Sequence, residues 1–461
     1  MDPIILAVIK KKFKFKDIKE VLQLAFPAMI ENILQVLLGI VDTFFISKLG
    51  TEAIVGVGAT NILMNLYIAF FTAVGVGTTA VVARNIGTKN IKKASHATQQ
   101  SILMAVGIGF LTGFITLVFA RQILEILGLE ERVIEYTLPY FLVVAVPSAF
   151  LALMLVLSSA LRGAGDTRTP MKVTLIVNVI NVILDYVLIF GIVDFEGLGI
   201  LGAGIATTAS RLIGVLLILI FLNRKSSLLN ISIKFPWTFD KILIKKISLI
   251  GYPAALERLV MRVGQLVYSA MIIKIGTDAY AAHNIAGSIE SLSYMPGYGF
   301  AIAASTLVGQ NLGAKRPDRS EYLGLLSNWL GTIFMVCVGI IFFIFARPLG
   351  LLFTRDEVVL KQVILVLRII ALVQPFLCIT LVITAALQGA GDTRFPMYST
   401  FIGIWGIRVI GVYILGFVFN MGLVGVWIAV ASDLILRGVF LMFRYKRGKW
   451  KEIDIDINAK N

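Results

Sequence analysis

Three oxygen-bearing side chains interrupt long apolar stretches of this sequence. Asp42 lies in the first stretch, and Asn181 and Asp185 lie four residues apart in the fifth, which places them on one face of a helix. Carboxylate and amide oxygens in surroundings of low dielectric can bind Na⁺ or hold a proton. We therefore expect one cation pocket. The structural alternative is that these carboxylates hydrogen-bond to helix ends or pair with Arg211.

Further polar residues extend the same two helix faces. Glu31 and Gln35 precede Asp42 at intervals of four and seven, and Asn178 precedes Asn181 by three residues. Glu31 lies four residues after a proline, and Glu257 does the same in the second half of the chain. Because the two positions are equivalent, they could also share a structural role. We expect all four residues to line a cavity or its scaffold.

The chain repeats itself once. "ALRGAGDTRTPM" at 160–171 returns 226 residues later as "ALQGAGDTRFPM" at 386–397. A constant offset across separated landmarks indicates a duplicated unit. The oxygen-bearing residues are not repeated, because the positions equivalent to Asp42, Asn181 and Asp185 are Tyr268, Ile407 and Gly411. This broken symmetry is the clearest pointer to function in the sequence.

Composition indicates a membrane protein. Of the 461 residues 58% are hydrophobic and 15% charged, and the mean hydropathy is +0.90. A soluble protein could not bury so much apolar surface. Twelve stretches exceed the roughly 20 residues that a bilayer helix needs. They are 21–47, 51–83, 97–120, 136–161, 170–193, 199–222, 247–275, 278–309, 322–346, 358–387, 396–419 and 422–443.

These stretches predict an all-α polytopic membrane protein, with twelve helices in two pseudo-symmetric six-helix lobes around a central cleft. We expect a basic cytoplasmic segment (1–18), a first lobe (19–222), a cytoplasmic linker (223–246), a second lobe (247–445) and a cytoplasmic tail (446–461). Most Lys and Arg residues outside the stretches fall in loops on one side, so both termini are expected in the cytoplasm. We expect a monomer in the plasma membrane.

Several other classes of site are disfavoured. The basic residues behind the net charge of +15 flank the spans and do not form one basic face, which argues against nucleic acid as a partner. Two cysteines and two histidines predict neither a disulfide framework nor a histidine metal site. The repeated "GAGDTR" lacks the Lys-Ser/Thr of a phosphate loop. It predicts a helix end, a tight turn and a new helix begun by proline.

The second half carries its own charges within apolar stretches: Glu257, Arg258, Arg262, Glu290, Arg408, Asp433 and Arg437. Asp433 and Arg437 are four residues apart, so they can pair on one helix face. A buried ion-pair network and a role in substrate binding both remain open for these residues.

Taken together, these motifs resemble the multidrug and toxic compound extrusion (MATE) family over about residues 18–445. The resemblance rests on "VDTFFISKLG", "ALRGAGDTRTPM" with its repeat, "NVILDYVLIFG" and "VGQNLGAKR". It implies a V-shaped antiporter of twelve helices that exports organic cations in exchange for H⁺ or Na⁺, without a further cofactor.

The resemblance also implies site residues. The family's coupling-cation site falls on Asp42, Asn181, Asp185 and Thr207, and a family glutamine falls on Gln35. The NorM-like branch carries a glutamate where this chain has Met261, which favours a DinF-like chain coupled through its first lobe. Residues expected at the substrate or cavity are Glu31, Gln35, Asn178, Glu257, Arg258 and Met261.

We therefore expect a secondary antiporter that exports amphiphilic cations by rocking-type alternating access. One alternative is a flippase for lipids or lipid-linked oligosaccharides. Such a flippase would need a strongly cationic cavity, whereas the first lobe of this chain is acidic. A membrane-embedded enzyme is the poorer alternative, because no HExxH, GxSxG, His cluster or paired Asp motif lies at a membrane boundary.

Overall fold

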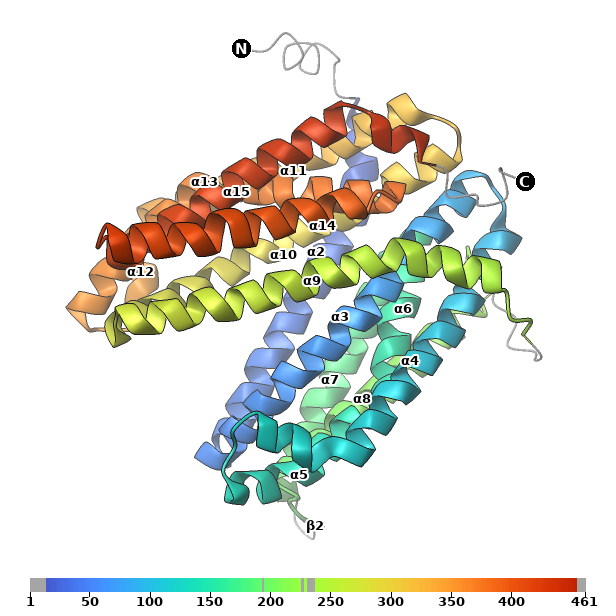
Figure 1. Ribbon diagram of the computed structural model, residues 1–461. Helices are drawn as coiled ribbons and strands as arrows, with labels where there is room; N and C mark the ends of the chain where they lie inside the picture. The colour runs from blue at the N-terminus through green and yellow to red at the C-terminus, as the bar shows by residue number, and fades with distance from the viewer. Residues whose placement is uncertain (1–13, 193–194, 225–227, 230–236, 454–461) are drawn as a thin grey trace. The chain divides into compact units, whose positions relative to one another are not determined.

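A computed structural model describes residues 14–192, 195–224, 228–229 and 237–453, and nearly all of them are helical (Figure 1). The expected all-α polytopic architecture is confirmed. The basic segment expected at 1–18 lies mostly outside the described residues. Parts of the expected linker (225–227 and 230–236) and of the expected tail (454–461) lie outside them as well.

The described residues of the first half form seven helices and a two-stranded hairpin. They are α2 (Phe15–Ser47), α3 (Thr51–Gly87), α4 (Ile91–Ile126), α5 (Glu131–Ala145), α6 (Ser148–Ala164), α7 (Arg168–Phe190), β1 (Gly191–Ile192), β2 (Phe195–Glu196) and α8 (Ile200–Leu222). The antiparallel hairpin, which pairs Gly191 with Glu196, was not predicted from the sequence.

The second half repeats this order without the hairpin. It comprises α9 (Lys241–Ile275), α10 (Thr277–Gly313), α11 (Pro317–Ile344), α12 (Ala346–Leu351), α13 (Glu357–Ala390), α14 (Arg394–Phe401), η1 (Ile402–Val409), η2 (Val412–Val418), α15 (Gly422–Lys446) and η3 (Lys449–Glu452).

Each predicted apolar stretch corresponds to a helix or to a group of consecutive helices. Within the described residues, nine helical segments are long and apolar enough to cross a membrane, and α5 with α6 makes ten if the bent pair is one span. The other two stretches form α9 and α10, which have 35 and 37 residues. Both carry charged residues within their sequences, such as Arg262 in α9 and Glu290 in α10.

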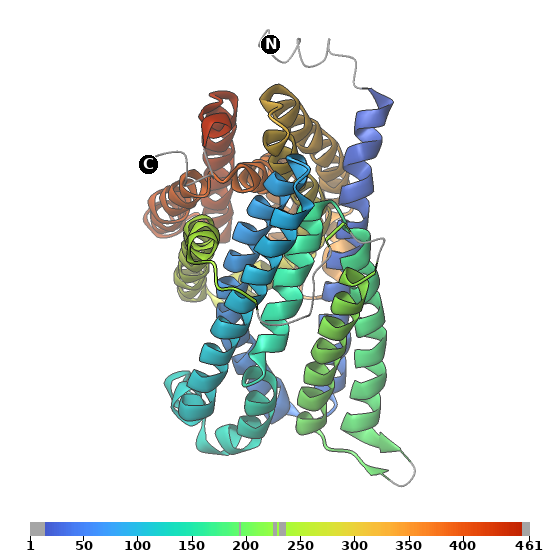
Figure 2. The same ribbon diagram turned by 90° about the vertical axis from the view of Figure 1, so that its right-hand side faces the viewer.

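The chain divides into two compact units whose boundaries fall inside α2 and α9. Residues 30–259 belong to one unit, and residues 14–29 with 260–453 belong to the other. In the first unit α3, α4 and α6 pack together, and α7 lies beside α8 in both views (Figures 1 and 2). The β1–β2 hairpin closes the α7–α8 pair at one end (Figure 2).

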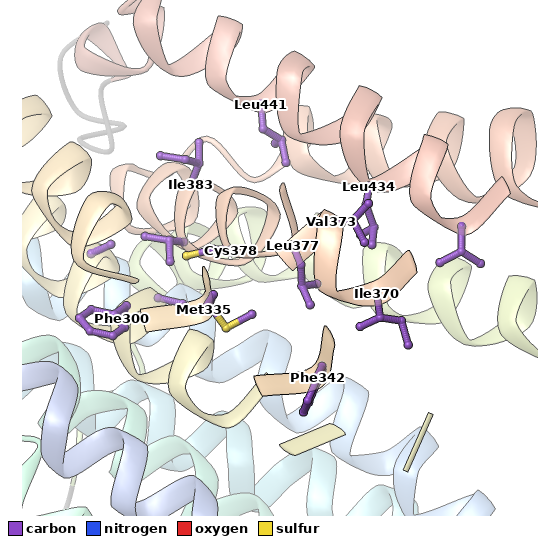
Figure 3. Packing of buried hydrophobic residues seen from close by; sticks show 14 of the residues in the cluster. Phe300, Met335, Phe342, Ile370, Val373, Leu377, Cys378, Ile383, Leu434 and Leu441 are labelled. Atoms are coloured by element: carbon purple, nitrogen blue, oxygen red, sulfur yellow. The ribbon is translucent and has the colours of Figure 1, made fainter. Parts of the chain in front are cut away.

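In the second unit α13 packs against α10, α11 and α15. Figure 3 shows this apolar core, in which Phe300 of α10 and Met335 of α11 lie near Leu377 of α13. Buried Leu434 and Leu441 project toward it from α15 (Figure 3).

The repeated "GAGDTR" motif ends a helix in each half, as predicted. Gly165 and Gly391 follow α6 and α13 in the left-handed conformation, with φ of 92° and 93°. A Cβ on Gly163 would approach the Thr79 carbonyl oxygen to 2.8 Å, and one on Gly389 would collide with the carbonyl of Ser305. The motif is therefore conformational and serves helix packing.

The fourth span of the first half is broken, whereas its counterpart is continuous. α5 and α6 meet at a bend of 42° before Ser148, while α13 runs unbroken past Pro375. Carbonyls near the end of a helix lack partners within the helix. Side chains of α8 bind two of them, because Thr208 donates to Val143 O at 2.8 Å and Arg211 Nη1 lies 3.5 Å from Val144 O.

Candidate functional site

An acidic pocket lies within the unit of residues 30–259. It is a cavity of about 140 Å³ between α2, α3, α5, α7 and α8. It is lined by Gly39, Asp42, Thr43, Ile46, Val57, Asn61, Tyr140, Val144, Asp185, Ile189, Ala203, Thr207 and Arg211. Three of the four residues expected to bind the coupling cation, Asp42, Asp185 and Thr207, therefore line one cavity.

The fourth residue, Asn181, ties the two carboxylates together. With its amide nitrogen turned toward them, Asn181 donates to Asp185 Oδ2 at 3.0 Å and to Asp42 Oδ1 at 3.2 Å. The interval of four residues on α7 allows this contact, because it stacks Asn181 and Asp185 on one helix face. Both side chains are 2% exposed, and Asp42 is half-buried at the cavity.

The bonding of the acid pair is incomplete. The carboxyl groups of Asp42 and Asp185 also interact with each other, and one proton shared between them would stabilise this contact. Asp185 Oδ1 is buried and has no hydrogen-bond partner in the described structure. Buried polar atoms in folded proteins generally have a hydrogen-bond partner, and Asp185 Oδ1 is one of several here that lack one. An unpartnered carboxylate oxygen beside a cavity is thus suited to a proton or a small cation.

The donor set favours hard cations. It consists of the carboxylates of Asp42 and Asp185, the Thr207 hydroxyl and the Asn61 amide. Oxygen-only sets suit H⁺ and alkali or alkaline-earth ions, whereas histidine and cysteine suit transition metals. No group of three or more His, Cys, Asp or Glu side chains occurs in the described part of the chain. The donor set therefore suits a proton or a hard metal cation.

Comparison with known proteins decides the family. The model of the MatE family matches residues 27–187 and again residues 253–414, one match in each half of the duplication. The chain belongs to this family. The MatE family, that of the multidrug and toxic compound extrusion transporters, is the one that the sequence motifs resemble. The chain is accordingly a membrane transport protein.

Similar curated proteins agree with this assignment. The chain is 35% identical to a probable multidrug resistance protein NorM of Thermotoga maritima, over 94% of this chain and 93% of that protein. It is 31% identical to an FAD transporter of Shewanella oneidensis, over 69% and 71% of the two chains. Membership of a DinF-like branch stays a prediction.

Solved structures share the fold of this MatE chain. A MOP superfamily transporter from Pyrococcus furiosus matches with a TM-score of 0.87 at 23% identity, over 95% of this chain and 97% of that one. A MATE protein in its straight conformation matches with the same TM-score at 24% identity, over 94% and 97%.

The remaining residues predicted in the first half lie outside the pocket lining. Glu31, 2% exposed, accepts a hydrogen bond from Arg162 Nη2 at 2.7 Å, which is a buried ion pair between α2 and α6. Asn178 donates to the Leu34 carbonyl at 2.7 Å and ties α7 to α2. Gln35 is exposed. Glu31 and Asn178 thus have structural partners within their own unit, and their roles in substrate binding stay predictions.

The predicted residues of α9 are divided between the two compact units. Glu257 and Arg258 fall in the unit of residues 30–259, and Met261 falls in the other. All three are half-buried. Their proposed place at a substrate cavity stays a prediction.

The second half holds a buried ion-pair cluster instead of an acid pair. Asp433 is fully buried, and its Oδ2 accepts from Arg408 Nη2 at 2.7 Å and from Arg437 Nη2 at 3.1 Å. Of the two possibilities left open by the sequence, the ion-pair network is present, and Asp433 pairs with Arg437; a role in substrate binding stays a prediction. Arg408 lies in the π-helical segment η1, a geometry that rotates side chains relative to the regular α7 of the first half.

Several residues that line the acidic cavity were not predicted as site residues from the sequence. Thr43 was available as the neighbour of Asp42, and Arg211 follows Thr207 by one helical turn. Tyr140 and Asn61 come from other helices, and nothing in their local sequence indicates the cavity. Only the packing of α3 against α5, and of α5 against α8, brings them to it.

Proposed function

We propose that this MatE chain is a secondary antiporter that exports amphiphilic organic cations in exchange for H⁺ or Na⁺. The coupling ion binds in the first lobe at Asp42, Asn181, Asp185 and Thr207. The observation that carries the proposal is the pair of carboxylates bridged by one amide beside a cavity, with a buried oxygen that has no hydrogen-bond partner among the described residues.

The chemistry of the pocket supports coupling. An ionisable group within a span is costly to insert and usually marks an ion path. Occupancy by a cation changes the charge of the pocket and can therefore favour one conformation over another. Exchange requires that ion and substrate prefer different states, which we propose interconvert by rocking of one lobe against the other. We place the protein in the plasma membrane as a monomer, with both termini in the cytoplasm.

The substrate class is proposed from the relatives and from charge. Several curated relatives carry the names of multidrug resistance or export proteins. An acidic pocket attracts cations and repels anionic lipid head groups. In the second half, Asp433 offsets the charge of Arg408 and Arg437, which weakens the case for a strongly cationic pyrophosphate cavity.

Flavin nucleotide export is a second candidate. The FAD transporter of Shewanella oneidensis is similar over 69% of this chain. FAD carries phosphates and would require basic contacts, whereas the first-half pocket offers two carboxylates and one arginine. Efflux of FAD from loaded proteoliposomes distinguishes the two candidates, because only a flavin exporter would release it faster than protein-free vesicles.

The coupling role is tested with Asp42→Asn in proteoliposomes that contain ethidium, under an imposed pH gradient and then an imposed Na⁺ gradient. Asparagine preserves shape but cannot change charge, so we expect loss of ion-driven efflux with normal folding. Glu135→Gln is the matched control, because Glu135 is an exposed acid of the same unit. Ion-driven efflux at the wild-type rate in Asp42→Asn would remove the basis of the proposal.

Asp185→Asn should have the same effect. The double variant should be no worse than either single variant, since residues of one site are not additive. Two partial losses that add up would instead place Asp42 and Asp185 in separate sites.

A further inference from the structure

We propose that Arg211 is a built-in cation of the acidic pocket and that it limits the pocket to one monovalent coupling ion. The inference rests on the proposed function and adds the residue that sets the charge of the site. Asp42, Asp185 and Arg211 are the ionisable carboxylate and guanidinium side chains among the cavity lining. Their formal charges leave the empty pocket at minus one.

The guanidinium of Arg211 is held only weakly. Among the described residues it forms no ion pair, and its one hydrogen bond, from Nη1 to the Val144 carbonyl, is long at 3.5 Å. Its charge nevertheless acts on Asp42 across the cavity. A positive charge that faces the acids without being bonded to them competes with any cation that enters.

The duplicated half shows the equivalent arginine with a carboxylate partner. The position 226 residues after Arg211 is again an arginine, Arg437, but the position equivalent to Thr207 is Asp433. Asp433 lies one turn before Arg437 and binds it at 3.1 Å, while Arg408 takes the same carboxylate oxygen at 2.7 Å. The arginine is therefore present in both halves, and it is paired with a carboxylate only in the second.

The local backbone explains the difference. In the first half the break between α5 and α6 frees the Val144 carbonyl, which can accept from Arg211. The equivalent residue, Ile370, lies inside the continuous α13, where its carbonyl belongs to the helix. With threonine at 207 and a freed carbonyl beside it, Arg211 can stay charged within the pocket without a permanent carboxylate partner.

The consequence is a limit on both the charge and the affinity of the site. One H⁺ or one Na⁺ brings the pocket to neutrality, whereas Ca²⁺ would leave an excess positive charge. In a site of low dielectric, a guanidinium that lines the same cavity weakens cation binding by roughly tenfold or more. Such weakening favours release of the ion on each cycle.

The test is charge rescue in the full-length protein in nanodiscs. Binding of radiolabelled tetraphenylphosphonium is measured while Na⁺ at fixed pH, or H⁺ at zero Na⁺, competes. Arg211→Gln should lower the half-maximal concentration of the competing ion about tenfold or more. It should also allow Ca²⁺ to compete. Arg211→Lys is the matched control that retains the charge, and it should behave as the wild type.

Asp185→Asn leaves Asp42 and Arg211 at a formal charge of zero and should abolish competition. Asp185→Asn combined with Arg211→Gln restores a charge of minus one and should bring competition back. Arg211→Gln alone could fail to fold. The double variant removes one charge of each sign, so comparing its competition with that of Asp185→Asn still tests the role of Arg211. An unchanged midpoint in Arg211→Gln, or a double variant no better than Asp185→Asn, would overturn the inference.

Failure of the proposed function gives a different pattern. If the pocket is not the coupling site, Asp42→Asn keeps wild-type competition by Na⁺ and H⁺. If the pocket is the coupling site and only the role of Arg211 is wrong, Asp42→Asn abolishes competition while Arg211→Gln leaves the midpoint in place.

Discussion

Replacing Asp433 by asparagine should destabilise the second unit strongly. The carboxylate is fully buried, and its Oδ2 accepts from both Arg408 and Arg437, whose side chains are 12% and 9% exposed. Asparagine keeps the shape but removes the negative charge that two guanidiniums share. Two positive charges would then face each other in surroundings of low dielectric.

The expected cost follows from the loss of a buried ion pair. Removing one partner of such a pair typically costs about 3–5 kcal/mol, because the other partner is left buried and uncompensated. For a unit of this size, each kcal/mol lowers the melting temperature by about 2–4 °C. We therefore expect the melting temperature to fall by roughly 10 °C.

The assay is thermal unfolding in detergent, followed by size-exclusion chromatography with fluorescence detection. Asp278→Asn is the control, because Asp278 is an exposed acid of the same unit; it should shift the free energy of unfolding by less than about 1 kcal/mol. Arg408→Gln added to Asp433→Asn should recover part of the loss, since it removes one orphaned charge. A shift as small as that of Asp278→Asn would show that another acid or bound water compensates the arginines.

Two further predictions concern the first unit. Glu31→Gln should lower the free energy of unfolding by about 2 kcal/mol, because it leaves Arg162 without its buried carboxylate. Thermal unfolding should show this loss, while the cation dependence of transport stays unchanged. Normal stability with a loss of cation dependence would instead place Glu31 on the ion path. The backbone N–H of Leu243 donates to Asp240 at 3.0 Å and holds the pKa of that carboxyl below its ordinary value. The stabilisation is complete above about pH 4 and is lost as the pH falls through the lowered pKa. Because asparagine keeps the N-cap hydrogen bond but not the charge, Asp240→Asn should cost about 0.3–1 kcal/mol at pH 7 and progressively less below pH 4 in thermal unfolding; a cost independent of pH would contradict this.

Much of the fold could be predicted because it depends on length, apolarity and repetition. Long apolar stretches can only be helices in a bilayer, since each backbone polar group must be satisfied internally. The repeated "GAGDTR" fixed a helix end in both halves, because Gly165 and Gly391 adopt a conformation that other residues avoid. The spacing of Asn181 and Asp185 likewise placed both on one helix face.

What could not be predicted depends on contacts between distant helices. The ion pair of Glu31 with Arg162 joins residues that no periodicity relates, and the same holds for Arg408 with Asp433. The break between α5 and α6 lies inside a stretch that reads as one span, because proline within an apolar run is tolerated in membrane helices. The π-helical geometry around Arg408 does not change the spacing of the hydrophobic residues, so the sequence does not indicate it.

The close backbone approach at Gly163 and Gly389 has a consequence for how this protein can change under drug selection. At both positions any side chain would strike the backbone of the neighbouring helix, at Thr79 and at Ser305. A random mutagenesis screen should therefore find these codons among clones that fail to accumulate protein, and not among clones with an altered resistance profile. Adaptation to a new toxic compound must proceed through other positions, so the segments most alike between the two halves are those least able to evolve new specificity.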